Sequence, residues 1–350
     1  MKHYHKLFYI LFFITAFNGA CAQSGFVYKA VKKHPLQAKN QLRNTVLSQN
    51  PDIIDITSLL PKGYVTDGTV DYTRFIQTGI NNYEKVLMPN FSILVNDGGL
   101  SIPSNRLIVF NTNSKLILKS SQLQSYQIIR IWEASNIKLY FPCIEGDRDR
   151  HTGTGGEWGM GLGISSSTNI EVYYPEVYNC WGDGLYLGVR GDSGTNNSIL
   201  IYYGFFDNNR RNGISIISGT NIKIKNPIIA NTNGTNPQCG IDIEPNTNKE
   251  VINNIRIENA LTYNNYQKGI LVSLVNHFGP EVKNVGIDII NHTDYSMRGG
   301  FSVVGADSRK FSTATKAMQG QIKIIGPKWY NGKGATYKKN DLDPLVKILP

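Results

Sequence analysis

The sequence has 350 residues, of which 41% are hydrophobic and 18% are charged. This composition excludes a disordered chain and suffices for one large all-β domain or two smaller domains. The formal net charge is +10 at pH 7, which favours an anionic partner such as an acidic polysaccharide, although it also serves solubility alone. No cluster of lysines and arginines with interleaved aromatic residues is present, so nucleic acid is not an expected partner.

The first 22 residues have the pattern of a secretory signal peptide. A basic MKHYHK precedes LFYILFFITAF, an apolar run of eleven residues that is too short to span a bilayer. Ala20-Cys21-Ala22 offers a small-residue cleavage site. Asn18 stands where a lipoprotein signal has an aliphatic residue, which favours plain secretion over acylation of Cys21. We therefore predict a secreted or periplasmic protein with no membrane span, and lipoprotein anchoring through Cys21 is the alternative.

The remaining chain divides into three parts. Residues 23–49 are predicted to form an extended or helical lead-in, and residues 50–330 a single β-helix domain. Residues 331–350 are predicted to be a loosely attached tail, because NGKGATYKKNDLDPL is polar and lacks alternation. The cysteines beyond the signal peptide are an odd number and too sparse for a disulfide framework, so we expect them to be reduced and buried. They are Cys143, Cys180 and Cys239.

Two short phrases recur through the β-helix domain. The first is Asn followed by alternating aliphatic residues, as in SNIKLY (135–140), TNIEVY (168–173), TNIKIK (220–225) and NNIRIE (253–258). The second is Gly followed by alternating aliphatic residues, and its glycines at 161, 184, 213, 240, 269 and 300 lie 23, 29, 27, 29 and 31 residues apart. A period of this size predicts a solenoid, and a residue spacing of two predicts that its coils consist of short strands.

The alternation assigns residues to the two faces of one predicted sheet. One set of stacked side chains is predicted to point inward: Leu162, Leu185, Ile214, Ile241 and Ile270, with Ile164, Leu187, Ile216, Ile243 and Val272 two residues on. The residues between them form a predicted outward column of Gly163, Tyr186, Ser215, Asp242 and Leu271, with rungs about 4.8 Å apart. We therefore predict an all-β parallel β-helix; the alternative is an antiparallel sandwich.

The segment before the first repeats supplies a family resemblance. TDGTVDYTRFIQTGI (66–80), followed by VLMPN and LSIPSNRLIVF, resembles the entry into the pectin-lyase-like superfamily of right-handed parallel β-helices. The resemblance implies a single-stranded right-handed solenoid with a short N-terminal capping helix, in a superfamily of polysaccharide lyases, glycoside hydrolases, epimerases and tailspike depolymerases. The Asn-Thr-Asp, Asp-Asp and Gly-His-Gly signatures of its polygalacturonases are absent here, as are the calcium site of pectate lyases and the Asp-Pro-His motif of epimerases.

A glycine-rich, charged loop precedes the regular coils. EGDRDRHTGTGGEWGMG (145–161) carries Arg148, His151, Glu157 and Trp158. Arginines suit carboxylate or sulfate groups and a tryptophan can stack on a sugar ring, so Arg148, His151 and Trp158 are candidate substrate-binding residues. The alternative is an ordinary solvated loop.

The next coil supplies a second group of candidates. NCWGDGLYLG (179–188) places Trp181 and Asp183 just before the strand and Tyr186 on its outward side, and Arg211 lies at the following corner. Trp181, Tyr186 and Arg211 are predicted to bind substrate. The alternative is that Asp183 merely forms the corner turn.

QCGIDIEPNTN (238–248) places two acids on one face of a strand. Alternation with Ile241 and Ile243 puts Asp242 and Glu244 on the outward face, about 7 Å apart at the backbone. Glycoside hydrolysis uses two carboxyl groups, about 5 Å apart for retention and about 6.5–9.5 Å for inversion. Asp242 and Glu244 with Asp183 and Glu157 are therefore the candidate catalytic acids, and the wider spacing favours inversion.

The favoured function is hydrolysis of an extracellular, acidic polysaccharide by a glycosidase. The first alternative is a lyase that cleaves a uronate-containing glycan by β-elimination, for which His151, Tyr186, Arg211 or Lys268 is a candidate base. The second is a non-catalytic carbohydrate-binding solenoid. No cluster of residues has metal-ligand spacing, so no cofactor is expected, and a calcium ion held by outward acids stays open as an alternative.

Overall fold

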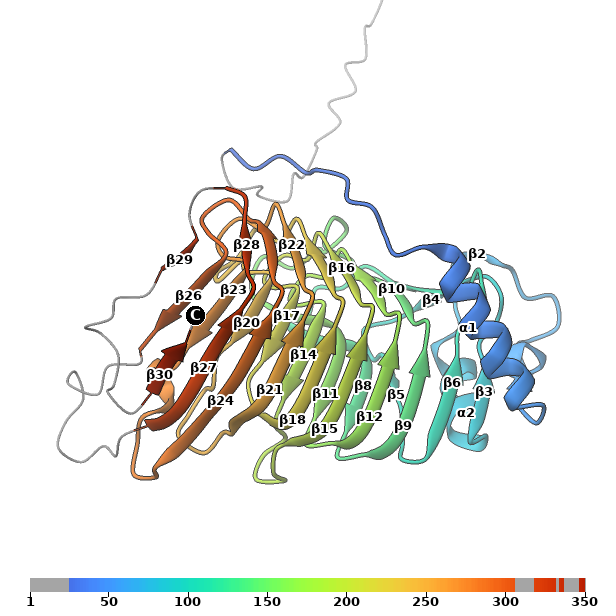
Figure 1. The fold of residues 1–350 in the computed structure, drawn as a ribbon. Coiled ribbons are helices and arrows are strands. Elements are labelled where there is room, and N and C mark those ends of the chain that lie inside the picture. The colour runs from blue at the N-terminus through green and yellow to red at the C-terminus, as the bar shows by residue number, and fades with distance from the viewer. Residues whose placement is uncertain (1–24, 306–317, 332–333, 337–345, 350) are drawn as a thin grey trace, which may run out of the picture.

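The computed structural model describes residues 25–305, 318–331, 334–336 and 346–349, so the predicted signal peptide and Cys21 lie outside the described residues. The chain winds into a parallel β-solenoid of about nine turns, with its strands in three long sheets (Figure 1). Each full coil contributes one strand to sheet A, then one to sheet B and one to sheet C. None of the helices in the described part of the chain is long and apolar enough to cross a membrane.

The three sheets contain eleven, ten and nine strands among the described residues. Sheet A consists of β1 (Ile54–Asp55), β3 (Lys85–Leu87), β6 (Arg106–Val109), β9 (Ser135–Tyr140), β12 (Thr168–Tyr173), β15 (Asn196–Tyr202), β18 (Gly219–Lys225), β21 (Ile252–Glu258), β24 (Lys283–Ile290), β27 (Met318–Ile325) and β30 (Val346–Leu349). Sheet B consists of β2 (Asp67–Asp71), β4 (Ser92–Val95), β7 (Lys115–Leu118), β10 (Cys143–Glu145), β13 (Glu176–Tyr178), β16 (Phe205–Asp207), β19 (Ile228–Ala230), β22 (Leu261–Tyr263), β25 (Thr293–Tyr295) and β28 (Lys328–Trp329). Sheet C consists of β5 (Leu100–Ser101), β8 (Ser125–Trp132), β11 (Trp158–Ser165), β14 (Leu185–Gly188), β17 (Ile214–Ile216), β20 (Ile241–Ile243), β23 (Ile270–Ser273), β26 (Phe301–Val304) and β29 (Ala335–Thr336).

The predicted inward columns of sheet C are confirmed residue by residue. Leu162 pairs with Leu185, Leu185 with Ile214, and the column continues through Ile241 to Ile270. All five side chains are buried. The strands are parallel throughout these sheets, so the antiparallel sandwich is excluded.

The glycine that opens each sheet C strand is required by close packing between coils. A Cβ atom added at Gly213 would lie 2.7 Å from the carbonyl oxygen of Gly240 and 2.1 Å from Cγ2 of Ile229, which belongs to sheet B. Gly184 is confined in the same way by the carbonyl oxygen of Gly213, at 2.8 Å. The recurring glycine therefore allows sheets B and C to meet at a sharp corner.

Asparagines form ladders at other corners of the coil. Asn221 and Asn254 have positive φ angles of 55° and 51°, which asparagine tolerates better than most residues. Their side chains continue a ladder, since Asn221 donates to Asn197 at 2.8 Å and Asn254 donates to Asn221. The repeated asparagine of the first sequence phrase thus both turns the chain and links adjacent coils.

A short helix covers the N-terminal end of the solenoid, as the resemblance implied. Helix α2 (Thr73–Asn82) follows β2 and buries Ile76 and Ile80. It packs on the short helix η1 (Ile56–Leu59), where a Cβ atom at Gly79 would lie 2.8 Å from Cγ2 of Ile56. The first coils therefore do not expose their apolar interior.

The lead-in crosses the outside of several coils before it enters the solenoid. Residues 25–35 run along the solenoid toward helix α1 (Leu36–Gln49), in the direction opposite to coil progression (Figure 1). The backbone oxygen of Val27 accepts a hydrogen bond from Asn264 at 2.9 Å, and Tyr28 donates to Asp207 at 2.8 Å. Arg43 of α1 then lies 4.4 Å over the ring of Phe141. The lead-in thereby links late coils to early ones.

The predicted end of the solenoid at residue 330 requires a correction. Strand β29 pairs with β26, and strand β30 pairs with β27. The predicted tail therefore adds strands to sheets C and A. The reason is that VKIL at 346–349 resumes the alternation that is absent from residues 331–345.

The three cysteines of the described chain are free thiols, as predicted. Cys180 and Cys239 are buried, and burial raises the pKa of both thiols. Because the thiolate is the reactive form, we expect slow alkylation of these two residues in the folded protein and labelling of all three after unfolding without reductant. Mass spectrometry after timed alkylation measures this. Fewer than three labelled thiols among Cys143, Cys180 and Cys239 in the unfolded protein would contradict the assignment.

Candidate functional site on the outer face of sheet C

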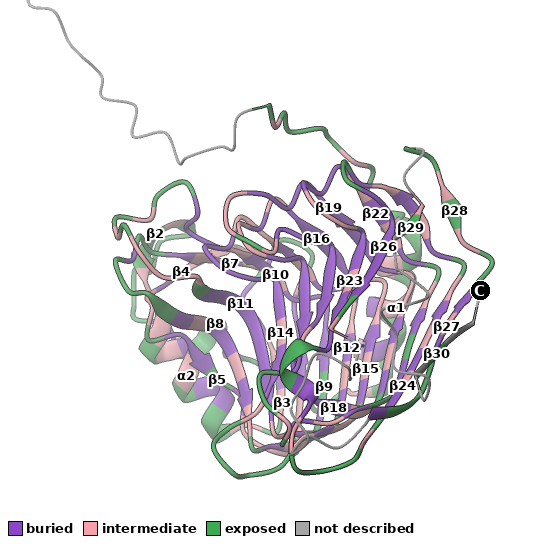
Figure 2. Cartoon of the chain, turned by 90° about the vertical axis from the view of Figure 1, so that its left-hand side faces the viewer, coloured by how far each residue is buried: buried purple, intermediate pink, exposed green. Residues whose placement is uncertain are grey.

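The outward column of sheet C has the predicted register but is far less exposed than expected. Tyr186 pairs with Ser215, Ser215 with Asp242, and Asp242 with Leu271. Ser215 and Asp242 are nevertheless 0% exposed, although they lie on the outer side. Most residues of the sheet C strands β11, β14, β17 and β20 are buried (Figure 2). The polar side chains here therefore pack against one another under the flanking loops.

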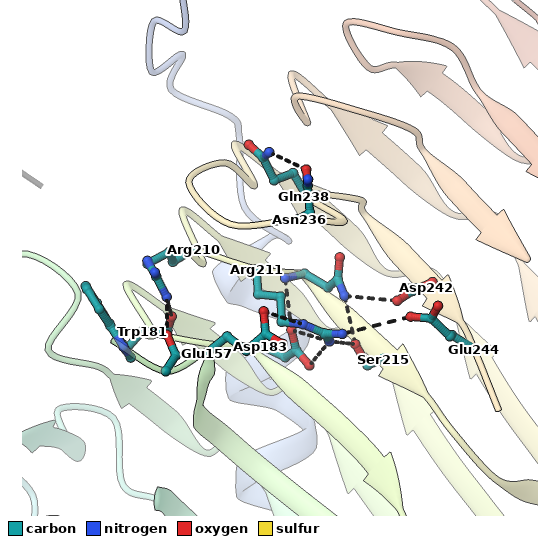
Figure 3. Close-up of polar contacts among 12 residues, drawn as sticks. Glu157, Trp181, Asp183, Arg210, Arg211, Ser215, Asn236, Gln238, Asp242 and Glu244 are labelled. Carbon is teal, nitrogen blue, oxygen red and sulfur yellow. Dashed lines mark hydrogen bonds and ion pairs between the residues drawn. The ribbon is translucent and has the colours of Figure 1, made fainter. Parts of the chain in front are cut away.

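Arg211 is the centre of this polar cluster. Its Nη1 atom lies 3.1 Å from Oδ2 of Asp183, its Nε atom 3.7 Å from Oε2 of Glu157, and its Nη2 atom 3.9 Å from Oε2 of Glu244. Its Nη1 also donates to Ser215 at 3.3 Å. Figure 3 shows Glu157 and Asp183 on one side of the Arg211 side chain and Asp242 and Glu244 on the other. The four predicted catalytic acids come from successive coils and lie in one cluster around Arg211.

Asp183, predicted as a candidate catalytic acid, is buried at the base of the cluster. It is 0% exposed and accepts hydrogen bonds from the backbone N–H of Asn212 at 3.0 Å and from Arg211. Burial raises the pKa of Asp183, and the positive charge of Arg211 opposes this effect. This carboxylate therefore orients Arg211 and has no open path to a substrate.

Asp242 is also buried, but its environment differs from that of Asp183. Its Oδ2 atom accepts a hydrogen bond from the side chain of Asn212 at 3.2 Å, and its Oδ1 atom has no partner among the described residues. Burial, followed by the negative charge of Glu244, raises the pKa of Asp242 well above its usual range. Both effects favour the protonated form of Asp242.

Glu157 and Glu244 are the two acids that solvent reaches. Their side chains are 33% and 30% exposed, against 12% for Arg211 between them. Because both carboxylates contact one guanidinium, at 3.7 and 3.9 Å, they lie no more than about 10 Å apart. This limit accommodates the separation of about 6.5–9.5 Å between the acids of inverting glycosidases. A substrate would meet these two groups first.

The raised pKa of Asp242 predicts a pH-dependent stability. Its pKa is raised on folding, so the stabilising effect of its proton is complete below the unfolded-state pKa and is lost as the pH rises toward the folded-state pKa. Asp242→Asn carries no titrating group. We therefore expect the stability of this variant relative to wild type to increase with pH in that window, by up to about 1.4 kcal/mol per pH unit. Urea unfolding of both proteins at several pH values measures the difference, and a constant difference would argue against a buried proton.

Two predicted binding residues of the glycine-rich loop prove to be structural. Arg148 is 6% exposed and donates to Asn208 at 2.8 Å and to Asn233 at 2.8 Å. The side chain of His151 is 0% exposed, and its Nδ1 atom lies 2.9 Å from Asp147. Both side chains hold the loop against neighbouring coils, so neither is open to a glycan.

Trp181 does not offer the open ring face expected of a sugar platform. His151 stacks on one part of its ring system, with the centroids 4.0 Å apart, and the guanidinium of Arg210 lies 3.8 Å from its ring centroid. The residue is only 9% exposed. Trp158, in contrast, is 48% exposed beside Glu157. Trp158 is therefore the better placed of the two predicted tryptophans for stacking on a sugar.

Some residues of the cluster were not predicted as site residues. Asn212 is 0% exposed and donates to both Asp242 and Ser215. Asp183 and Asn212 each directly precede a recurring glycine, so the repeat places Asn212 one coil after Asp183. This position next to a candidate acid was the available signal. Among the described residues no group of three or more His, Cys, Asp or Glu side chains is arranged to hold a metal ion.

Comparison with known proteins places the chain by its fold. No family model matches the sequence. It is 24% identical over 269 residues to the uncharacterized protein YclG of Bacillus subtilis, covering 69% of this chain and 45% of YclG. It is 23% identical over 163 residues to the uncharacterized protein YorA of the SPbeta prophage in the same organism, covering 42% and 28% of the two chains. The chain thus spans less than half the length of these relatives.

Solved structures share its architecture at low sequence identity. The gene product 12 of bacteriophage phi29 superimposes with a TM-score of 0.58 at 16% identity, covering 82% of this chain and 39% of the phage protein. The A-module of the mannuronan C-5 epimerase AlgE6 of Azotobacter vinelandii gives 0.53 at 16% identity, covering 78% and 75%. The surface adhesin PfbA of Streptococcus pneumoniae gives 0.50 at 11% identity, covering 85% and 82%. These likenesses show a shared parallel β-solenoid fold.

Proposed function

We propose that the protein is an extracellular, polysaccharide-active enzyme that hydrolyses glycosidic bonds of an acidic glycan on the outer face of sheet C. The observation that carries the proposal is the placement of Glu157 and Glu244 on either side of Arg211, with the buried Asp242, whose pKa is raised, next to Glu244. Pairs of acids whose environments separate their protonation states are typical of general acid and base roles. The predicted N-terminal signal peptide supports the extracellular part of this proposal, with secreted, periplasmic and Cys21-anchored forms as its alternatives.

The arrangement assigns a role to each acid. Glu244 is the partly exposed acid next to the buried Asp242, and we assign it the role of general acid, which delivers a proton. Glu244 would pass this proton to the glycosidic oxygen as the bond to the anomeric carbon breaks. The carboxylate of Glu157 would take a proton from a water molecule whose oxygen attacks that carbon. The limit of about 10 Å on the separation of Glu157 and Glu244 admits the wider spacing that leaves space for this water in inverting enzymes.

The other residues position these two acids. Asp183 fixes Arg211 from below, and Arg211 contacts both Glu157 and Glu244. Asn212 holds Asp242 through its side-chain amide. Trp158 is exposed beside Glu157 and can stack on a sugar ring at the edge of the site.

A lyase is the second candidate, supported by Tyr186. Tyr186 lies on the outward column one coil before Ser215, and burial, followed by the negative charge of Asp183, raises the pKa of its phenol. In this candidate a carboxylate of the cluster, Glu157 or Glu244, would take the C-5 proton, the protonated phenol of Tyr186 would donate a proton to the leaving glycosidic oxygen, and Arg211 would neutralise the uronate carboxylate. The mannuronan C-5 epimerase with the same fold is named for chemistry at C-5 of such a polymer.

A panel of acidic and neutral polysaccharides distinguishes these candidates. Hydrolysis creates new reducing ends without ultraviolet absorbance, whereas β-elimination also creates an absorbing double bond. We expect reducing ends alone, on an acidic polymer. Absorbing products would replace the hydrolase by the lyase, and binding without either product would indicate a carbohydrate-binding solenoid.

A further inference from the structure

The outer face of sheet C continues from the acid cluster to a pair of arginines nearer the N-terminus. Arg130 in β8 pairs with Gly163, Gly163 with Tyr186, and Tyr186 with Ser215. Arg130 therefore lies three coils before Ser215 in the same outward column. At about 4.8 Å per rung this corresponds to roughly 14 Å along the solenoid. The length of one pyranose unit in an extended glycan is similar to the spacing between adjacent coils. The distance from Arg130 to Ser215 therefore corresponds to a few sugar units.

Arg130 and Arg190 share one aromatic partner. The guanidinium of Arg190 lies 4.0 Å from the ring centroid of Trp132, and that of Arg130 lies 5.2 Å from it. Arg190 is exposed, and Arg130 is partly buried. Burial, followed by the positive charge of Arg190, lowers the pKa of Arg130. Two positive charges are thus held close together against a single indole ring.

Neither arginine forms an ion pair with an acid in the part of the chain that the structure describes. The acids nearest to them in the sequence are engaged elsewhere, since Glu133 accepts a hydrogen bond from Ser193 and Asp192 pairs with Lys249 at 3.2 Å. Arg211 differs, because three carboxylates contact it. The arginine pair is therefore a concentration of positive charge that an anion would stabilise.

Two unpaired polar atoms lie on the same strand. The side-chain oxygen of Gln127 and the indole N–H of Trp132 are buried and have no hydrogen-bond partner among the described residues. A Cβ atom added at Gly163 would lie 2.4 Å from that Gln127 oxygen, so the Gln127 amide rests over the glycine and forms the surface between Arg130 and Tyr186. Buried donors and acceptors are seldom left unpaired, so these two atoms mark β8 as a polar segment beside the arginine pair.

We propose that Arg130 and Arg190, arranged around Trp132, bind an anionic substituent of the glycan chain that reaches the acid cluster. The inference rests on the proposed function and specifies its substrate as a polyanionic glycan, lying along the outer face of sheet C and several sugar units long. The bound group is a carboxylate or a phosphate, both of which a guanidinium fork accepts through paired hydrogen bonds. Uncharged side chains at these two positions would remove this contact without touching Glu157 or Glu244.

The test compares polymer binding by three proteins. The Arg130→Gln/Arg190→Gln variant removes the two charges, and Lys223→Gln/Arg256→Gln removes two charges from sheet A as a matched control. Dissociation constants are measured for a polyuronate, a polyol phosphate and a neutral glucan. We expect the first variant to bind one of the two anionic polymers roughly tenfold or more weakly, the control to bind it as wild type does, and glucan binding to be the same in all three proteins.

The outcomes separate this inference from the proposed function. Weaker binding of the polyuronate by the Arg130→Gln/Arg190→Gln variant identifies the bound group as a carboxylate. Weaker binding of the polyol phosphate identifies it as a phosphate. Unchanged anion binding by the Arg130→Gln/Arg190→Gln variant, or an equal loss in the sheet A control, would overturn the inference even if the enzyme cleaves a glycan. Selective loss without cleavage by the wild type would support the subsite and reject the hydrolase. Arg190→Gln alone changes only an exposed side chain, so a loss in the same direction there excludes misfolding as the cause.

Discussion

Glu244→Gln is expected to lower turnover of the glycan substrate by a factor of about 10² to 10⁴, the usual contribution of general acid–base catalysis. Glutamine keeps the shape of the side chain but cannot donate a proton to the glycosidic oxygen. The same loss is expected for Glu157→Gln, which cannot take a proton from water. Because both side chains are partly exposed, 30% and 33%, neither substitution should unfold the protein. Initial rates at saturating substrate, with thermal unfolding as a check on folding, measure both effects.

A control is available on the same solenoid. Glu84 is exposed at the start of β3, in sheet A, and Glu84→Gln removes the same charge away from the cluster. We expect this variant to retain wild-type turnover. Full activity in Glu244→Gln and Glu157→Gln would show that these two surface acids have no role in catalysis. A loss of similar size in Glu84→Gln would show that net charge, rather than position, controls the rate.

Arg211→Ala is expected to destabilise the folded protein by about 3–5 kcal/mol, the usual effect of removing one partner of a buried ion pair. The reason is that Asp183 is 0% exposed and loses the cation that lies 3.1 Å from its carboxylate. Burial already raises the pKa of Asp183, and removing Arg211 raises it further. The folded variant therefore takes up a proton that the unfolded chain does not hold. Its destabilisation should be larger at pH 8 than at pH 5, because the stabilising proton is lost as the pH rises.

Arg210→Ala provides the comparison for this prediction. Arg210 is the adjacent arginine, and it donates to the carbonyl oxygens of Gly156 and Trp181 while it stacks on the Trp181 ring. It makes no ion pair with Asp183 within the described structure, so its removal should show little pH dependence. Chemical unfolding of both variants across this pH range separates the two cases. A pH-independent loss in Arg211→Ala would mean that packing, and not the Asp183 charge, accounts for the destabilisation.

The solenoid architecture and the identity of the clustered acids could be predicted because both depend on the local periodicity of the sequence. Alternation put Ile241 and Ile243 inside, and the recurring glycine set the register that brings Asp183 next to Arg211 and Asp242. The same pairing register recurs between successive sheet C strands, since each coil has the same order of glycine and aliphatic residues. The parallel solenoid and its capping helix therefore followed from the residues and the family resemblance.

The surroundings of the cluster could not be predicted because they depend on contacts between irregular loops. Nothing in the residue pattern indicates that His151 and Arg210 both cover the Trp181 ring, or that Arg148 turns back onto Asn208 and Asn233. The burial of Asp183 has the same origin. Alternation predicts whether a side chain points into or out of the solenoid, but it does not predict whether a loop covers an outward side chain.

The arginine pair was missed for a related reason. Arg130 and Arg190 are far apart in the sequence and meet only through Trp132, which both contact. Neither residue is an acid and neither follows a recurring glycine, so the repeat pattern does not bring the two together.

The most direct test of the central claim is a crystal structure of the Glu244→Gln variant with a bound oligosaccharide of the substrate that the polysaccharide panel identifies. We predict that the sugar chain lies along the outer face of sheet C, with a glycosidic oxygen between residues 157 and 244 and an anionic group toward Arg130 and Arg190. A chain bound on sheet A or sheet B, away from Arg211, would contradict the account.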